Sequence, residues 1–406
     1  MDKFQRHYIT IAANDSTEEL KSCADIVCEG SHDELTIQKI IDKCAEEKKD
    51  IFLLNGTYHI DGFYDFGDGG PKAALRFPNN RQEISFSGQK KPYGKQNSGV
   101  ILYVTPLALE QIDGEGYDVI RTVWKERGMG SGSALHMENI DIQLSHNKKP
   151  VRCIDLRRCD RPELKNVGMG ACRDMNAGFG NPPSPAVKGC IGLTMTDGSN
   201  AFFSNYTDVN ASGFYEGIQV GGEHVVMINC AAIMNVYGYT FGNYEINCGA
   251  NHPITMINCM DERNVNLPLF NACGDSDGNG SRLQGNQEVT MISFNLEYIA
   301  NQSPGKTHGH RMKEVYPGTW KGNIDFTIQP AWCHLNAEDF QLWENDGSGT
   351  GIKTRNNCHK QICTSAERLS YYPTYGQQIF DTDLNKMVIC IDPASKKWVD
   401  FYGNEV

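Results

Sequence analysis

Two glutamates in a repeated segment are spaced so that they could act together on one substrate. The segment is written three times, as HVVMINCAAIMN at 224–235, PITMINCMDERN at 253–264 and EVTMISFNLEYI at 288–299. Aligning the copies on their shared methionine places Ile233, Glu262 and Glu297 at one position. If each copy lies on the next at the ~4.8 Å spacing of neighbouring strands, the two carboxylates come within about 5 Å of each other.

A carboxylate pair at that separation suits the cleavage or transfer of a glycosidic bond. Retaining glycosidases hold an acid and a nucleophile roughly 5 to 5.5 Å apart. Two like charges this close also push their pKa values apart, which supplies one acid and one base. We therefore predict Glu262 and Glu297 to be catalytic. The alternative interpretation is that both are solvated surface carboxylates of an acidic protein.

Charged residues flank Glu262 on both sides. In the aligned register Asp261 and Arg263 point inward, where they would need each other as an ion pair. A slip of one residue would turn both outward. Asp261 would then join the carboxylates, and Arg263 could hold a substrate carboxylate. Asp261 is thus a further catalytic candidate, and Arg263 and Tyr298 are substrate-binding candidates.

A second group of acidic residues lies upstream. Asp208 and Glu216 come just before the strand that contains Gly217, and they are reserve catalytic candidates. Glu245 follows an equivalent strand, and we predict that it binds substrate together with Tyr244. A tyrosine ring could stack on a sugar, although aromatic residues at coil bends usually serve packing.

The sequence predicts no cofactor. DSDGNGS at 275–281 imitates the start of a calcium loop, but the twelfth position is Asn286, not glutamate. A Ca²⁺ ion near Asp275 and Asp277 is the alternative to a simple glycine-rich turn. His308 and His310 in THGHRMKE are alternative acid or base groups, because a loop histidine titrates near neutral pH.

The elements that would position these residues begin with a helix over 31–49. Ser31 and Glu34 have the spacing of a capping box. An apolar stripe follows at helical spacing, formed by Ile37, Ile40, Ile41 and Cys44. DIFLLNGTYHI then predicts a buried strand, an Asn-Gly turn and a second strand.

This region resembles the opening of pectate-lyase-like right-handed parallel β-helix proteins. The similarity runs through IAANDSTEELKSCADIVCEGSHDELTIQKIIDKCAEEKKDIFLLNGTYHIDG, and residues 24–30 and 53–60 carry it. In such proteins a helix covers the end of the coil and leads into the first strand. The resemblance implies a fold whose members mostly act on polysaccharides, in a groove along one outer face.

The middle of the chain favours the same fold independently. From Val100 to about Gln329, short β-prone runs such as VILYV, ALHMENIDIQL, IGLTMT and YGYTF alternate with turn residues, and repeats of this length indicate a solenoid. Simple alternation predicts that Val226, Ile228 and Cys230 face the interior. The equivalent residues Asn229, Asn258 and Ser293 would then form a hydrogen-bonded ladder on the other face or at a bend.

We therefore predict an all-β protein, a right-handed parallel β-helix with an N-terminal capping α-helix and a small C-terminal β appendage. The predicted boundaries are 1–60 for the cap, 61–330 for the β-helix and 331–406 for a polar loop region with a β-hairpin module. QQIFDTDLNKMVICIDPASKKWVDFYGNEV reads as strand, turn, strand. It resembles a short terminal module of phage tail-fibre and gut-bacterial proteins.

Bulk properties limit the partners. A net charge of −12 argues against nucleic acid and anionic membranes. No apolar run is long enough to span a bilayer, and no secretory signal is visible. The 15 cysteines lack CxxC pairs, which favours reduced, buried thiols. We expect a cytoplasmic or virion-associated protein, with an extracellular location as the alternative.

Three functions agree with these observations. The first is a glycoside hydrolase or transglycosylase acting on a poly- or oligosaccharide. The second is a polysaccharide lyase acting on uronic-acid glycans, for which Arg263 would neutralise charge and Tyr298 or a histidine would act as base. The third is a non-catalytic, tail-spike-like glycan-binding protein. A homo-oligomer is expected in each case, with a trimer favoured.

Overall fold

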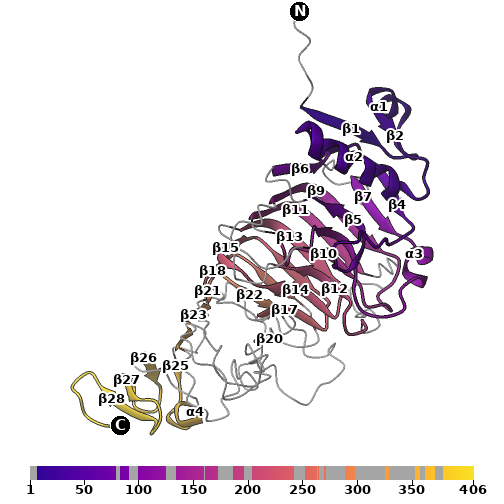
Figure 1. Cartoon of the computed structure of the whole chain (residues 1–406). Helices are drawn as coiled ribbons and strands as arrows, with labels where there is room; N and C mark the ends of the chain where they lie inside the picture. Colours follow the sequence, from indigo (N-terminus) through magenta and orange to yellow (C-terminus); the bar gives the residue numbers. More distant parts are fainter. Residues whose placement is uncertain are drawn as a thin grey trace, which may run out of the picture.

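The strands of this protein stack into a parallel β-helix, the predicted fold class (Figure 1). The computed structural model describes residues 7–78, 83–90, 99–124, 134–159, 161–171, 186–195, 204–241, 252–262, 264, 269–270, 289–297, 325–328, 353–356, 362–370 and 378–406. Within them, parallel pairing joins each coil of the β-helix to the next through backbone hydrogen bonds.

Each coil has three sides, which we call sides 1, 2 and 3. Side 1 consists of β3 (Asp50–Leu53), β6 (Glu83–Gly88), the first halves of β9 (Ala134–Leu144), β11 (Arg161–Ala171) and β13 (Asn205–Ser212), and then β15 (Glu223–Ile228), β18 (His252–Ile257) and β21 (Val289–Ile292). Side 2 consists of β4 (Gly56–Ile60), β7 (Val100–Val104), the second halves of β9, β11 and β13, and then β16 (Ala231–Ile233), β19 (Met260–Glu262) and β22 (Asn295–Glu297).

Side 3 is a separate sheet. It consists of β5 (Lys72–Phe77), β8 (Tyr117–Thr122), β10 (Arg152–Asp155), β12 (Ile191–Thr194), β14 (Glu216–Val220), β17 (Tyr237–Phe241) and β20 (Leu269–Phe270). The chain therefore visits the three sides in a fixed order, and residues at equal positions in successive coils stack into columns.

A left-handed residue separates side 1 from side 2 in each of six successive coils. These residues have φ between 52° and 58° and form the column Asn139, Asn166, Asp208, Asn229, Asn258 and Ser293. Asparagine and aspartate tolerate this conformation better than other non-glycine residues. Their side chains bond along the column: Asn258 Nδ2 donates to Asn229 Oδ1 over 2.8 Å, and Asn166 Nδ2 donates to Asn139 Oδ1 over 2.8 Å. The predicted ladder is confirmed between Asn229 and Asn258, and Ser293 continues the column at the bend by its backbone conformation.

The bend corrects the predicted interior. Met227 and Cys230 are both fully buried, whereas Val226 and Ile228 are half-buried on the outer face. The left-handed Asn229 between the two strands breaks the alternation of side chains, so inward residues are separated by three positions across the bend instead of two. The assignment of Cys230 was right, and that of Val226 and Ile228 was wrong for this reason.

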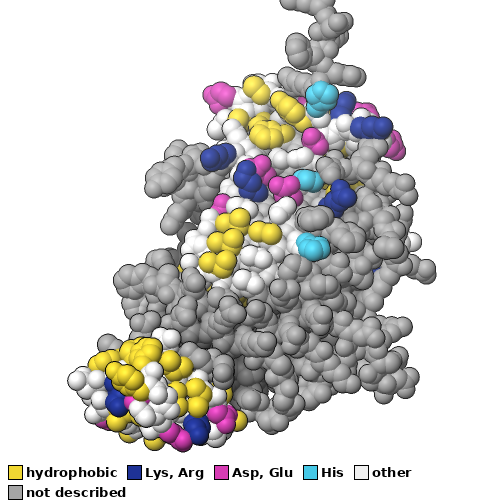
Figure 2. Space-filling model, turned by 90° about the vertical axis from the view of Figure 1, so that its left-hand side faces the viewer, with side chains coloured by type: hydrophobic (Ala, Val, Ile, Leu, Met, Phe, Trp, Pro, Cys, Tyr) yellow, Lys and Arg dark blue, Asp and Glu magenta, His cyan; other side chains and the backbone are white. Residues whose placement is uncertain are grey.

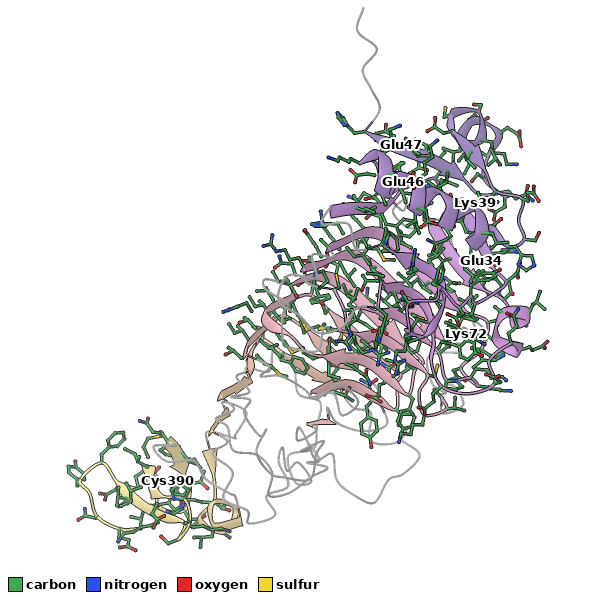
Figure 3. The ribbon with its side chains drawn as sticks, in the orientation of Figure 1. Glu34, Lys39, Glu46, Glu47, Lys72 and Cys390 are labelled. Carbon is green, nitrogen blue, oxygen red and sulfur yellow. The ribbon has the colours of Figure 1, made fainter. Side chains whose placement is uncertain are left out.

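Helix α2 (Asp33–Glu47) covers the open end of the first coil with the predicted stripe, since Ile37, Ile40, Ile41 and Cys44 are buried. The predicted capping box is absent from this helix. Its N-cap is His32, whose side chain makes no capping bond. Glu34 points instead into the coil, where it accepts from Tyr64 Oη over 2.8 Å and from the Asp61 amide over 3.0 Å (Figure 3). The carboxylate thus attaches the helix to the coil.

Four further strands among the described residues precede or follow the main stack, and two short helices accompany it. At the N-terminal end, β1 (Tyr8–Ala12) pairs in parallel with β3 and β2 (Ile26–Val27), and the helices are α1 (Glu18–Cys23) and α3 (Pro106–Glu110). Beyond the last described coil, β23 (Asp325–Ile328) pairs in parallel with β24 (Lys353–Asn356). None of the described helices is long and apolar enough to span a membrane.

The C-terminal segment forms a small sheet with its own core. β26 (Gln378–Asp381), β27 (Lys386–Asp392) and β28 (Lys397–Asp400) form an antiparallel meander, joined by β25 (Ile362–Cys363) and α4 (Ser365–Ser370). The core consists of Ile379, Val388, Cys390 and Trp398 (Cys390 is labelled in Figure 3). Arg368 of α4 contacts Asp381 over 2.9 Å and lies over the Trp398 ring. The predicted strands and turn are present, and a third strand makes the predicted hairpin a meander.

Candidate functional site

The structure places the two predicted catalytic glutamates in one register on side 2. Ile233 of β16 pairs with Glu262 of β19, and Glu262 pairs with Glu297 of β22. The alignment of the three copies is therefore correct at the level of the backbone. Glu262 is the last residue of β19 and follows the fully buried Asp261. Its side chain is half-buried on the outer face. The side chain of Glu297 lies outside the described part of the structure.

Asp261 faces the interior, as the aligned register predicts. It is fully buried, and its Oδ1 accepts from Asn264 Nδ2 over 2.8 Å. Asn264 in turn accepts from the Asn235 amide over 2.7 Å, so the carboxylate belongs to a polar network inside the coil. Gly238 leaves room for this network, because a Cβ there would overlap both Asp261 and Asn264. The catalytic role predicted for Asp261 is corrected to a structural one, because the buried carboxylate cannot contact a polysaccharide.

The remaining predicted residues divide into two groups. Asp208 is part of the ladder at the bend, since its Oδ1 accepts from Asn229 Nδ2 over 3.2 Å. Glu216 lies on the outer face of side 3, away from the Glu262 column. The other candidates lie outside the described residues, namely Arg263, Tyr298, Glu245, Tyr244, Asp275, Asp277, His308 and His310. The described residues hold no cluster of three or more potential metal ligands.

The outer face of side 1 changes character along the stack. In β9 and β11 it is charged: His136 Nδ1 lies 2.9 Å from Glu163, and Lys165 Nζ lies 3.1 Å from Glu138. In β15, β18 and β21 the column below Lys165 becomes apolar, with Ile228, Ile257 and Ile292 in register. Ile292 is 38% exposed. Figure 2 shows this face with charged side chains above an apolar area. We call these three isoleucines the apolar column.

Side 3 carries a repeated pattern of outer residues that the sequence interpretation missed. The tetrads are DVIR (118–121), RCID (152–155), IGLT (191–194), EGIQ (216–219) and YGYT (237–240). Their first members stack on one another, and so do their last. The two middle positions belong to the interior: Ile154 and Ile218 are fully buried in the main core, and a Cβ at Gly192 or Gly217 would meet interior side chains. Two consecutive inward positions break simple alternation, which is why a search for period two overlooks this face.

A buried group of opposite charges occupies the first tetrads. Arg157 donates hydrogen bonds to the Asp155 carboxylate, with Nε 2.9 Å from each oxygen and Nη2 2.7 Å from Oδ2. Arg152 Nη1 lies 3.6 Å from Asp118 Oδ1, and the described residues donate no hydrogen bond to either oxygen of Asp118. Trp124 packs beside this group, with the guanidinium carbons of Arg157 and Arg158 4.9 and 4.7 Å from its ring centroid.

The two aspartates have pKa values that move in opposite directions. Burial raises the pKa of Asp118 well above its usual value, and the charge of the neighbouring Asp155 adds to this. Burial also acts against ionisation of Asp155, but Arg157 outweighs it through its charge and hydrogen bonds and lowers the pKa of Asp155 to about 2. Asp118 is therefore the member of the pair that takes up a proton first as pH falls, and Asp155 is the member that stays ionised to lower pH. Both side chains are almost fully buried, so this pair belongs to the packed part of the coil and does not face a substrate.

Comparison with known proteins adds one distant similarity. No protein-family model and no curated protein matches the chain. Among solved structures, tailspike protein 3 of bacteriophage CBA120 aligns with a TM-score of 0.24 and 10% identity, covering 91% of this chain and 67% of that chain. A similarity at this level carries no argument, so the strand registers are what establish the parallel β-helix. The resemblance to pectate-lyase-like proteins stays a prediction.

Proposed function

We propose that this protein cleaves or transfers glycosidic bonds of a poly- or oligosaccharide, with Glu262 and Glu297 as its carboxylate pair. The observation that carries the proposal is their pairing in register on β19 and β22. Neighbouring strands lie ~4.8 Å apart, which is close to the carboxyl separation of a retaining glycosidase. One carboxyl group would protonate the leaving oxygen, and the other would attack the anomeric carbon.

The surroundings of Glu262 support this assignment. Ile233 occupies the same position one coil earlier, and Met260 is the neighbouring outward residue of β19, half-buried like Glu262. Partial burial beside these apolar side chains reduces the hydration of the carboxyl group, which is a setting typical of a general acid.

Incubation with a glycan panel tests the proposal and separates it from its alternatives. New reducing ends without unsaturated products support hydrolysis, and product without new reducing ends supports transfer. Absorbance from unsaturated products would instead identify a lyase. Binding without any product would identify a glycan-recognition protein of the tail-spike kind. Either of the last two outcomes would refute the proposal for Glu262 and Glu297.

We further propose that the chain assembles as a homo-oligomer, with a trimer favoured, through the apolar column of side 1. Ile228, Ile257 and Ile292 offer an apolar surface that packing against another copy would remove from water. The ladder at the bend separates this column from Glu262, so assembly would leave side 2 accessible. A monomeric mass by light scattering would refute the assembly, and Ile257→Lys is expected to convert an oligomer into monomers. The cytoplasmic or virion-associated location stays a prediction.

A further inference from the structure

The last tetrads of side 3 hold a carboxylate in a fixed position at the surface. Glu216 Oε2 accepts from Thr240 Oγ1 over 2.7 Å and from Gln219 Nε2 over 2.9 Å. Gln219 Oε1 accepts from Thr194 Oγ1 over 2.8 Å, so side chains from three adjacent strands join one network. Such a network restricts the rotamers of its members. Both bonds to Glu216 are made to Oε2 and the side chain is half-buried, so Oε1 is the oxygen that we expect a ligand to contact.

Two tyrosines border this carboxylate. Tyr237 pairs in register with Glu216 on the next coil, and Tyr215 immediately precedes Glu216 in the chain. The two rings are half-buried, with centroids 5.9 Å apart and planes at 66°. Partial burial, and then the neighbouring Tyr215 and Glu216, raise the pKa of Tyr237, so its hydroxyl stays protonated. A half-exposed phenol presents an apolar ring and a hydrogen-bonding group together.

The charge of this surface differs from that of the first tetrads on the same side. There, Asp155 is neutralised by Arg157 and Asp118 lies beside Arg152. No basic side chain among the described residues forms an ion pair with Glu216, whose partners are the neutral Thr240 and Gln219. An acidic ligand would be repelled by the Glu216 carboxylate, whereas hydroxyl groups could donate to it with charge-assisted bonds.

We propose that Glu216, Tyr215 and Tyr237 form a binding site for a neutral sugar residue of an oligosaccharide. Sugar hydroxyls donate to Glu216 Oε1, and the apolar face of the sugar ring lies against the tyrosine rings. The site is on side 3, whereas Glu262 and Glu297 are on side 2, so it would hold a glycan independently of the proposed cleavage site.

Titration calorimetry with the full-length protein tests the site directly. The probes are neutral oligosaccharides of glucose, galactose, mannose and N-acetylglucosamine, and oligogalacturonate of matched length. Binding of at least one neutral probe is expected, about tenfold weaker in Glu216→Gln and in Tyr237→Ala. Tyr237→Phe, which keeps the ring, is expected to lose less affinity than Tyr237→Ala. The matched control Glu163→Gln makes the same charge change on side 1 and is expected to bind like wild type.

Three outcomes would overturn the proposal. They are a lack of binding by all neutral probes, tighter binding of oligogalacturonate than of every neutral probe, and unchanged affinity in Glu216→Gln and Tyr237→Ala. Melting curves of each variant identify any loss of folding, and Thr240→Val, which frees Glu216 without removing it, must also weaken binding. Glu262→Gln is expected to bind normally. Retained cleavage in Glu262→Gln would count against the catalytic pair alone, whereas unchanged binding in Glu216→Gln and Tyr237→Ala would count against this site alone.

Discussion

Asp118 and Asp155 should respond in opposite ways to the same substitution. Asp118 carries a raised pKa in the fold, so its proton contributes stability that is fully present below the unfolded value of 3.8 and is lost as pH rises through the folded pKa. Asparagine resembles the protonated acid and cannot ionise. We therefore expect Asp118→Asn to match wild type near pH 4. Above this, wild type should lose about 1.4 kcal/mol per pH unit relative to the variant until the folded pKa is reached.

Asp155 has a lowered pKa, so its contribution is present above pH 3.8 and is lost as pH falls toward about 2. The difference between 3.8 and about 2 corresponds to roughly 2 to 3 kcal/mol. Asp155→Asn also removes the carboxylate that Arg157 contacts at 2.7 and 2.9 Å, which leaves a buried guanidinium without its partner. We expect a loss of about 3 to 5 kcal/mol at pH 7.

Urea and thermal unfolding of wild type and both variants, followed by circular dichroism from pH 2 to pH 9, measure these effects. Asp118→Gln serves as the control for size, because it removes the same charge but adds a methylene group to a packed site. A pH-independent loss of stability in Asp118→Asn, equal to that in Asp155→Asn, would show that Asp118 is ionised and paired in the native protein. Asp118 would then not be the site that binds a proton more tightly in the folded protein.

Three further predictions concern the scaffold. Gly238→Ala should destabilise the protein by roughly 1 to 3 kcal/mol, because the added Cβ would overlap Asp261 and Asn264. A melting temperature equal to that of wild type would contradict the interior position of Asp261. Asn258→Ala should cost about 1 kcal/mol in urea unfolding through its bond to Asn229 and its φ of 52°, and Asn258→Gly should cost less than Asn258→Ala, since glycine tolerates this φ. Among the described cysteines, the exposed Cys23 should be alkylated in the native protein at pH 8. Cys28 and Cys190 should react only after unfolding, because burial raises their pKa values to about 12. Mass spectrometry of the labelled peptides measures both reactions.

Repetition in the sequence is what made the fold and the register of the site predictable. The three Met-Ile copies aligned Glu262 with Glu297 because a β-helix stacks equivalent residues of successive coils in register. The amphipathic stripe of α2 was equally clear, since Ile37 and Ile41 meet the core on one face. Both the stacking of coils and the periodicity of a helix can be predicted directly from the spacing of residues in the sequence.

Local backbone conformation is what the sequence patterns did not reveal. A left-handed Asn229 reversed the expected direction of Ile228, and two consecutive inward residues hid the polar tetrads of side 3. The spacing of Glu216 and Gln219, three positions apart and on one face, becomes intelligible only when the stacking of all five tetrads is known. Glu34 illustrates a third cause, because a tertiary contact with Tyr64 replaced the local capping bond.

The most direct test of the account measures turnover by wild type, Glu262→Gln, Glu297→Gln and the double variant on the glycan that the panel identifies. Two carboxylates that act as a unit should each cost about 10²- to 10⁴-fold in kcat when replaced, and the double variant should be little worse than the poorer single variant. Glu138→Gln and Glu163→Gln, which change the same charge on side 1, should retain wild-type turnover. Full activity in either Glu262→Gln or Glu297→Gln would contradict the proposed pair.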